Sequence, residues 1–555
     1  MAAEAMNSSS SDMSAGIEEK KTPSGAVESA IGPDEGALQE VSGSGDFHRS
    51  FSARQVHIIS LGSNIGSGLF IGTGKALANG GPGNMILAYL IVGTGVWANL
   101  QTLTEMTIAF PTSGNYIDYA GRWVDPALAF GAGFAEWLGW TAVFAAEAMF
   151  FIVLVNLWAE GSVPEGALLT VFLVPCLLLF LLPNKWFAWV EYFGSLVKIF
   201  LFVLIVVLSF ALIGGAGPDG YVHHGEFWTE LPAFKNGFSG FANAGLLAIW
   251  AVGDQVFIGV MGGEAQFPRM SMAHAANLVP FRTNFIYMLL IVFITILVPS
   301  DDDRLLSGSG VAASPFVIAV KDAGIKGIPD LLNACMIIGI VAIAVESIYL
   351  PSRILREMAL QKLVPAFIAS VDARGRPRWA LLITSAIATT LTYMSLSTDG
   401  TTVLNWLISI TSASFFLNWM IIAFTSLRFH AAIRAQNDPI FSETYSWRSK
   451  FWPLAPIWVL LVSTVLLACC LAAGIDPLGD AGFTANNFFL YIIGILIIVV
   501  FTLAYKIIYR TTWQDPATAD LVTGRRTISA EEIALLDAYF SMPLWRRIGT
   551  YVKLW

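Results

Sequence analysis

Long runs of apolar residues alternate with short polar segments from residue 54 to residue 510. A helix needs about 20 mostly apolar residues to cross the hydrocarbon core of a bilayer. Twelve runs reach that length, so the pattern predicts an all-α, multi-pass membrane protein with twelve transmembrane helices. The runs lie near residues 54–78, 84–110, 126–158, 164–183, 187–213, 238–260, 279–299, 328–358, 378–396, 403–430, 452–475 and 485–510.

The composition supports a membrane location and argues against several soluble classes. Of the 555 residues, 55% are apolar and only 13% are charged, whereas ordinary soluble proteins contain about 25% charged residues. A chain this long with so few charges cannot cover its surface with side chains that suit water. The composition therefore argues against a soluble enzyme, a nucleic-acid-binding protein and a disordered scaffold.

The two ends of the chain differ from its middle. Residues 1–50 hold nine acidic and three basic residues without apolar periodicity, which predicts a disordered tail and no cleaved signal peptide. Residues 51–510 form the predicted transmembrane domain, and residues 511–555 form a second tail. With the N-terminus in the cytosol, 25 of the 31 Lys and Arg residues are cytosolic, two lie within spans and four are external. This asymmetry predicts that both tails are cytoplasmic.

Two of the predicted membrane helices contain polar, glycine-rich interruptions. The first span contains Gly62-Ser-Asn-Ile-Gly-Ser-Gly68, and the sixth contains Trp250-Ala-Val-Gly-Asp-Gln255. Unwound backbone at membrane depth is tolerated only where it is buried in protein or lines a cavity. Glycines in membrane helices also serve as small packing surfaces between helices. Spans one and six occupy matching positions of a five-plus-five repeat, and interruptions paired in this way indicate the substrate site of a transporter.

Backbone groups at such interruptions suit an α-amino acid. The N–H groups that begin the second half of the first span suit a carboxylate. The carbonyl groups that end the first half of the sixth span suit an ammonium group. The predicted substrate-binding residues are Ser63, Asn64, Ile65, Gly66, Ser67, Gly68, Trp250, Ala251, Val252, Gly253 and Asp254.

The segment Gly62–Gly83 resembles the first-helix signature of the fungal amino-acid permeases, the yeast amino acid transporter family of the amino acid–polyamine–organocation superfamily. The resemblance covers roughly residues 50–550. It implies a LeuT-like inverted repeat, with repeat one at about 51–213, repeat two at about 238–430, and two extra helices at about 452–510. Further matching segments are Val124–Leu128, Gly263–Arg269, Ser314–Ile318, Asn405–Leu407, Arg428–Phe429 and Thr523–Arg526.

The resemblance also implies a function. Members of the family import amino acids by alternating access, driven by the proton gradient without a further cofactor, usually at the fungal plasma membrane. This chain departs from the family pattern at Asp254-Gln255-Val256, where the family usually has Gly-Thr-Glu, at Val345-Glu346-Ser347, and at Glu136. These departures predict a substrate preference that differs from that of the well-known members.

Ionisable residues inside the membrane are candidates for proton coupling or selectivity. The resemblance places Lys198, near the middle of the fifth span, where related transporters bind sodium, and it implies a bridge to the first span; a snorkelling or structural lysine is the alternative. Glu136 and Glu147 lie on one face of the third span. Glu136 is expected level with the two interruptions and facing the same cavity as Asp254. Glu191, near the cytosolic end of the fifth span, is expected to be solvated.

The leading interpretation is a secondary active permease that imports an amino acid with protons, and not an enzyme. Neutral substrates rank first from the resemblance, and cationic ones second because two carboxylates would face one cavity. Alternatives are a transporter of polyamines or related amines, and a sensor that binds amino acids with little flux. The expected partners are the substrate, protons, the lipid bilayer, and trafficking or ubiquitin-ligase machinery acting on the tails, which include Lys20 and Lys21. No nucleic acid, metal or catalytic residue is expected.

Overall fold

A computed structural model describes the chain at residues 62, 65–112, 114–218, 220–253, 267–306, 314–372, 375–396, 400–478 and 482–552. The predictions made for residues 1–50, Ser63, Asn64 and Asp254 lie outside these ranges. Within the ranges the regular secondary structure is helical, and no strand occurs there. The predicted all-α class is therefore confirmed for the described part of the chain.

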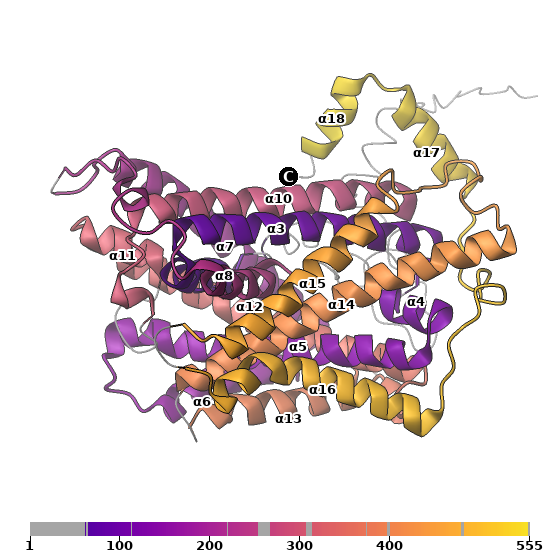
Figure 1. Ribbon diagram of the computed structural model, residues 1–555, viewed down its shortest axis with the longest axis horizontal. Coiled ribbons are helices and arrows are strands. Elements are labelled where there is room, and N and C mark those ends of the chain that lie inside the picture. The colour runs from indigo at the N-terminus through magenta and orange to yellow at the C-terminus, as the bar shows by residue number, and fades with distance from the viewer. Residues whose placement is uncertain are drawn as a thin grey trace, which may run out of the picture.

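Long helices run side by side and give the molecule the form of a bundle (Figure 1). Among the residues described, nine helices are long and apolar enough to cross a membrane. They are α3 (Thr73–Ala109, with the preceding Gly68–Gly72), α5 (Pro126–Ala159), α7 (Asn184–Ile213), α10 (Pro268–Leu297), α12 (Ile328–Leu360), α13 (Arg378–Tyr393, with the following Met394–Leu396), α14 (Gly400–Gln436), α15 (Leu454–Ile475) and α16 (Ala485–Tyr509).

Two shorter apolar helices complete the pattern. They are α6 (Glu165–Leu179), in the predicted fourth span, and α8 (Gly237–Val252), in the first half of the predicted sixth span. Each predicted span therefore overlaps a helix. The number of twelve crossings and the inverted repeat remain predictions.

The boundary between predicted spans one and two lies at Gly81 and Pro82. These residues fall inside α3, but Gly81 has φ 73° and ψ 173°, far from helical values. Glycine adopts positive φ at little cost, and the following proline has no N–H to donate to the helix. A Cβ at Gly81 would lie 2.7 Å from the carbonyl oxygen of Pro232. The turn therefore lets the segment before α8 pack directly onto the chain between the two spans.

Burial separates inner helices from outer ones. In the most apolar stretch of each helix, 83% of the residues of α5 are buried, but only 28% in α7 and 17% in α16. The outer helices expose large apolar side chains such as Phe200, Val207 and Ile507. A broad exposed apolar surface marks a contact with lipid or with another protein. In a chain with this many apolar helices, the outer surface is suited to the bilayer.

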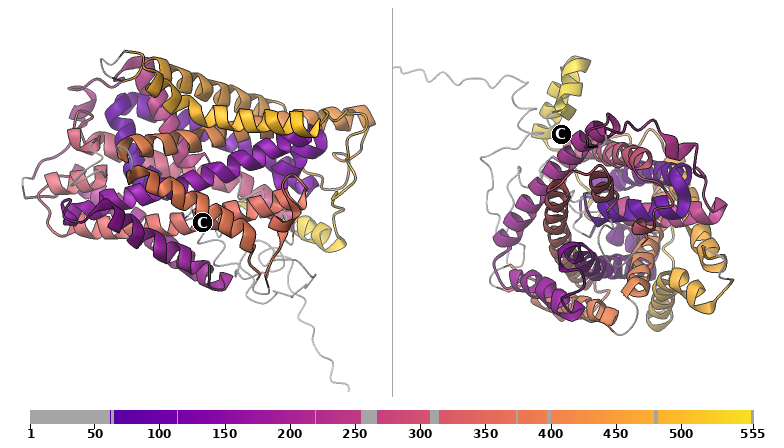
Figure 2. Two further views of the ribbon diagram at one scale, coloured as in Figure 1. Left: turned by 90° about the horizontal axis from the view of Figure 1, so that it is seen from below. Right: turned by 90° about the vertical axis from the view of Figure 1, so that its left-hand side faces the viewer.

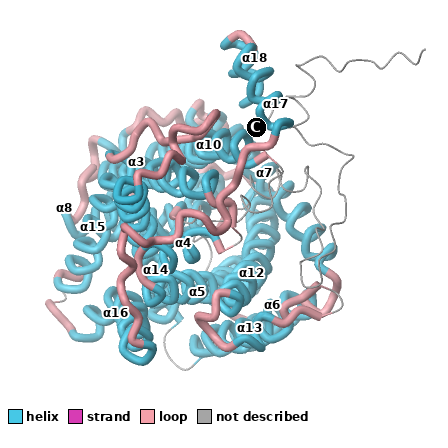
Figure 3. Tube along the Cα trace, turned by 90° about the vertical axis from the view of Figure 1, so that its right-hand side faces the viewer, coloured by secondary structure: helices cyan, strands magenta, loops and turns pink. Residues whose placement is uncertain are grey.

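The two ends of the bundle carry different segments. The end predicted to be external carries α11 (Pro315–Asp322), at the left of Figure 1, and Figure 2 (right) looks along the bundle from this end. The opposite end, seen in Figure 3, carries α4 (Asn115–Trp123). Three aromatic side chains of α4 are buried at this end: Tyr116, Tyr119 and Trp123.

The C-terminal segment packs across the same end as α4 (Figure 3). The backbone N–H of Gln514 donates to the carbonyl of Val124 at 2.8 Å, and that of Arg526 donates to the carbonyl of Ala109 at 3.2 Å. The segment ends in two helices, α17 (Ala530–Ser541) and α18 (Leu544–Val552). The predicted second tail is thus attached to the membrane domain over much of its length.

Candidate functional site

The interruption in the first span takes an irregular helical form. Gly68–Gly72 is a short π-helix that leads directly into α3. The N–H groups of Leu69 and Phe70 both donate to the carbonyl of Gly66, at 3.0 and 3.1 Å. π-Helical turns are rare and occur frequently at functional sites. The N–H groups predicted to hold a carboxylate lie at the start of this turn.

Glycines let this segment approach two other helices closely. A Cβ at Gly66 would lie 2.0 Å from Cδ1 of Ile343 on α12, and one at Gly68 would lie 2.7 Å from Cβ of Ala251 on α8. The packing interpretation therefore explains the absence of side chains at both positions. The same contacts place the first interruption directly against the end of α8.

The carbonyl groups at the end of α8 are already in use. Tyr287 on α10 donates through its hydroxyl to the carbonyl of Ala251 at 3.0 Å. Trp419 on α14 donates through Nε1 to the carbonyl of Gly253 at 2.9 Å. A carbonyl oxygen has two lone pairs, so each can accept one further hydrogen bond from a ligand. The sequence pattern did not single out Tyr287 or Trp419, because each lies in an ordinary apolar span.

Glu147 connects α5 to the first interruption. Ser67 Oγ donates to Glu147 Oε1 at 2.5 Å, and the glutamate is 1% exposed. Its second oxygen, Oε2, has no hydrogen-bond partner among the residues described. Leaving a buried acceptor unpaired is costly, so this oxygen favours a ligand that can donate to it. Glu147 thus touches the predicted substrate-binding segment.

Lys198 forms a buried ion pair with Glu191 on α7. Lys198 Nζ lies 3.6 Å from Glu191 Oε1, and both side chains are 0% exposed. The expectation that Glu191 is solvated is therefore wrong. Seven residues make about two helical turns, so both side chains lie on one face of α7. This face is turned inward, because a Cβ at Gly339 of α12 would lie 3.3 Å from Lys198 Cγ.

The expected bridge from Lys198 to the first span stays a prediction. The two spans meet one turn before the lysine, where a Cβ at Gly62 would lie 2.3 Å from Ser195 Oγ. Nζ of Lys198 has no hydrogen-bond partner within the described part of the chain. Ser63 and Asn64, which follow this contact in sequence, lie outside that part.

Glu136 occupies a different polar cluster. Its carboxylate accepts hydrogen bonds from Tyr116 Oη on α4 at 3.0 Å, from Asn418 Nδ2 on α14 at 2.6 Å and from Trp140 Nε1 at 3.2 Å. Eleven residues separate Glu136 from Glu147, which is a rise of about 16 Å along α5. Because Glu147 is the residue that contacts the first interruption, Glu136 is not level with it, contrary to the expectation. Three donors from the protein itself satisfy this carboxylate.

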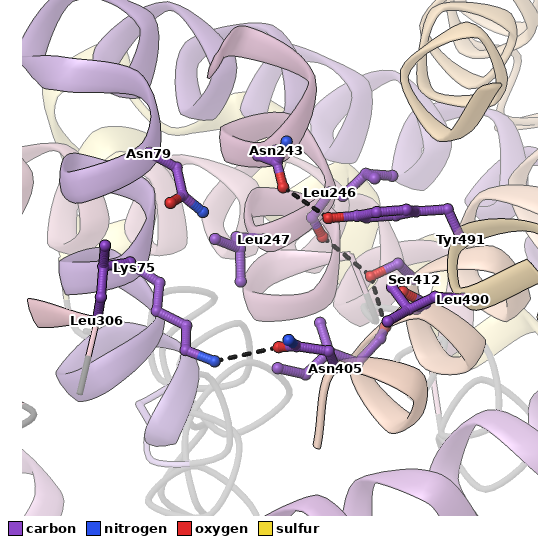
Figure 4. Close-up of a pocket in the computed structure, with 12 residues that line it drawn as sticks. Lys75, Asn79, Asn243, Leu246, Leu247, Leu306, Asn405, Ser412, Leu490 and Tyr491 are labelled. Atoms are coloured by element: carbon purple, nitrogen blue, oxygen red, sulfur yellow. Dashed lines mark hydrogen bonds between the residues drawn. The ribbon is translucent and has the colours of Figure 1, made fainter. Parts of the chain in front are cut away.

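A cavity of about 210 Å³ lies between α3, α8, α14 and α16. Figure 4 shows its side chains, with Lys75 from α3 and Asn405 from α14 joined by a hydrogen bond of 3.2 Å. On the other side, Tyr491 of α16 donates to Asn243 Oδ1 of α8 at 2.9 Å. The sequence pattern placed Lys75 within the first span and gave it no role.

Comparison with known proteins identifies the family. A family model described as amino acid permease matches residues 55–515. The chain belongs to this family. Among its relatives, amino-acid permease GAP3 of Candida albicans is 30% identical over 534 residues, which is 95% of this chain and 87% of the relative.

Other relatives are named for different specificities. The S-adenosylmethionine permease GAP4 of Candida albicans is 30% identical over 486 residues, covering 87% of this chain and 79% of the relative. The general amino-acid permease GAP1 of Saccharomyces cerevisiae is 28% identical over 516 residues, covering 90% of this chain and 84% of the relative. The resemblance found in the sequence is confirmed, and the family is one of transporters rather than enzymes.

The residues predicted for this permease fall into three groups in space. Ile65–Gly68, Trp250–Gly253 and Glu147 lie together, because Ser67 bonds to Glu147 and Gly68 packs on Ala251. Lys198 and Glu191 lie together on the buried face of α7. Glu136 lies apart, between α4, α5 and α14.

Proposed function

We propose that this permease imports a neutral α-amino acid together with protons, by alternating access around a site between the first interruption and the end of α8. The hydrogen bond from Ser67 to Glu147 carries the proposal. It brings a buried carboxylate against backbone N–H groups at the start of a π-helical turn. These are the two kinds of group that recognise an ammonium and a carboxylate.

The substrate carboxylate would bind the N–H groups at Gly66–Gly68. Backbone N–H groups that begin a helical segment carry partial positive charge and suit an anion. The substrate ammonium would bind Glu147 Oε2 and the remaining lone pairs of the Ala251 and Gly253 carbonyls. Tyr287 and Trp419 hold those carbonyls in place. A neutral side chain needs no further countercharge.

The Lys198–Glu191 pair supports proton coupling. A buried ion pair at 3.6 Å, without further hydrogen bonds from the described residues, recovers little of the cost of removing two charges from water. Transfer of one proton from the ammonium to the carboxylate leaves two neutral groups. Both forms have no net charge, so coupling requires that Glu191 takes up a proton from one side of the membrane and that the pair releases one to the other side when the packing around α7 changes during the transport cycle.

The position of Glu136 favours neutral over cationic substrates. The case for a cationic side chain rested on Glu136 and Asp254 facing one cavity, but Glu136 is bonded to Tyr116, Trp140 and Asn418. We further propose twelve crossings in a LeuT-like inverted repeat, cytoplasmic termini and a plasma-membrane location, on the strength of the charge asymmetry and the family.

Uptake in a permease-deficient yeast strain tests the proposal. Labelled amino acids and polyamines are supplied at external pH 5 and pH 7, and accumulation is compared with an empty-vector strain. We expect neutral amino acids to accumulate, and more so at pH 5. Binding with negligible accumulation would instead identify a sensor, and uptake of polyamines alone would identify an amine transporter.

The Lys198→Met variant tests the coupling. We expect it to lose accumulation driven by the pH gradient, because one member of the buried pair is removed. Lys326→Met, at an exposed lysine near α12, is the matched control and should behave as wild type. A Lys198→Met protein that still concentrates substrate down a pH gradient contradicts the coupling role.

A further inference from the structure

We propose that the cavity between α3, α8, α14 and α16 is a second binding site, separate from the central one, that takes carboxylate groups on Lys75. Its ligand class is carboxylate-bearing solutes, and in transport it receives the carboxylate of the incoming amino acid. The inference rests on the proposed import function and on the predicted external orientation of this end of the bundle. It adds a residue that selects substrates before they reach the central site.

The charge of the cavity is positive. Lys75 is the one charged residue among the described residues that line it. An ammonium group has three N–H donors, and Lys75 uses one of them on Asn405 Oδ1. None of the ion pairs among the described residues includes Lys75. A charged group inside a membrane protein is costly without a partner, so the site favours an anion.

The neutral polar groups of the wall complement Lys75. The side-chain amides of Asn79 and Asn405 retain N–H donors that no described residue accepts, and both side chains border the space beside Lys75 in Figure 4. On the opposite wall, the Tyr491 hydroxyl is turned to Asn243. A carboxylate in the cavity therefore meets donors from two helices, while an ammonium group would meet Lys75.

The size and place of the cavity suit an entry site. A volume of about 210 Å³ is roughly seven times the 30 Å³ that one water molecule occupies in the liquid. Lys75 follows Gly68 by seven residues, or about 10 Å along a helix. The cavity thus lies outside the central site, toward the starts of α8, α14 and α16.

The site predicts a charge preference for transport. A cation at the entrance attracts acidic and zwitterionic amino acids and repels lysine and arginine. In Lys75→Gln, we expect the glutamate concentration that half-inhibits uptake of labelled leucine to rise at least fivefold. Inhibition of leucine uptake by lysine should stay equal or become stronger.

Competition by glutarate tests the site directly. Glutarate is a dicarboxylate without an ammonium group, so it lacks one of the two groups that the central site recognises. We expect external glutarate to inhibit uptake of a labelled neutral amino acid competitively in wild type. Cadaverine, the diamine of the same chain length, should inhibit at least tenfold less. This comparison needs no variant, and absence of glutarate inhibition overturns the proposal.

Variants then locate the effect. Lys75→Gln should raise the glutarate concentration for half-inhibition at least tenfold, whereas Lys75→Arg should leave it within threefold, with surface abundance measured for each. If Lys75→Gln does not reach the surface, Asn79→Leu is measured instead. It removes a neighbouring hydrogen-bond donor and should raise the glutarate concentration for half-inhibition at least threefold. If glutarate inhibits Lys75→Gln, or the substitute variant Asn79→Leu, as strongly as it inhibits wild type, the proposed site is overturned. Wild type without any amino-acid uptake overturns the proposed function instead.

Discussion

The hydroxyl of Ser67 donates a hydrogen bond of 2.5 Å to the buried carboxylate of Glu147. This contact joins the irregular part of the first span to α5, one of the most buried helices in the described bundle. It gives a buried partner to the serine that lies between Gly66 and Gly68, and it leaves the second carboxylate oxygen of Glu147, which is 1% exposed, without a hydrogen-bond partner among the described residues.

Replacing Glu147 by glutamine tests whether its charge binds substrate. Glutamine has the same shape and can still accept a bond from Ser67, but it carries no charge. A hydrogen bond to a charged group contributes about 1.5–3 kcal/mol, so we expect kcat/KM for neutral amino acids to fall about tenfold to a hundredfold. Ser67→Ala should have a smaller effect. Wild-type kinetics in Glu147→Gln would place the substrate elsewhere.

Substitutions at Gly66 distinguish a packing role of the glycine from a role in substrate binding. Gly66→Val should abolish uptake with normal insertion, because its Cβ would lie 2.0 Å from Ile343 Cδ1 and branched atoms would cover the N–H groups. The double variant Gly66→Val, Ile343→Ala relieves the clash without uncovering those groups. We expect it to reach the membrane and remain inactive. Recovery of normal uptake in the double variant would show that the glycine serves packing only.

Glu136→Gln should affect stability and not selectivity. Three donors lose a charged acceptor, at a cost of about 1.5–3 kcal/mol for a charge-assisted bond. We expect a lower melting temperature in detergent and an unchanged ratio of KM for lysine to KM for leucine. A selective loss of lysine transport would return Glu136 to the substrate site.

The docking of α17 on the end of the bundle that carries α4 depends on Glu532. This buried side chain accepts a bond from the backbone N–H of Arg269 at 3.1 Å and pairs with Arg526 at 3.0 Å. Glu532→Ala should destabilise the docked tail by about 1–3 kcal/mol, seen as faster proteolysis after residue 526. The adjacent Glu531 is exposed, so the protease should cleave the tail of the Glu531→Ala protein at the wild-type rate.

The same contact should respond to pH. Burial raises the pKa of the Glu532 carboxyl above its ordinary value of 4.5, while the nearby Arg526 acts in the opposite direction. The docked carboxyl holds its proton more tightly than a free one, so docking is strongest below pH 4.5 and weakens as pH rises through the raised value. Proteolysis of the tail in isolated membranes should accelerate over that interval in wild type. Glu532→Gln, which cannot ionise, should show no such acceleration.

The N-terminal tail should be dispensable for binding. Deletion of residues 1–45 removes an acidic segment with Lys20 and Lys21, which are candidate ubiquitin acceptors. We expect unchanged KM and slower loss from the cell surface. A large change in KM would show that this segment contacts the transport path.

The sequence alone determined the class of this protein and predicted where its central site lies. Runs of about 20 apolar residues can satisfy backbone hydrogen bonds in lipid only as helices, so length and hydropathy were enough for the helical class. The interruptions at Ser67 and Gly253 were visible because glycine and polar residues stand out against an apolar background. Local pattern and family resemblance together predicted the permease family.

Only the tertiary structure decided which side chains meet. Helical spacing places Glu136 and Glu147 on the same face of α5, but it does not say that Ser67 reaches one and Asn418 the other. Glu191 was expected in water because depth was counted along one helix, whereas its exposure depends on α12 packing against α7. Lys75 had no assigned role in the sequence, because its cavity is formed by four helices that are distant along the chain. The burial of a side chain and its partners depend on residues that are far away in sequence. The periodic pattern within one helix does not show which residues of other helices these are.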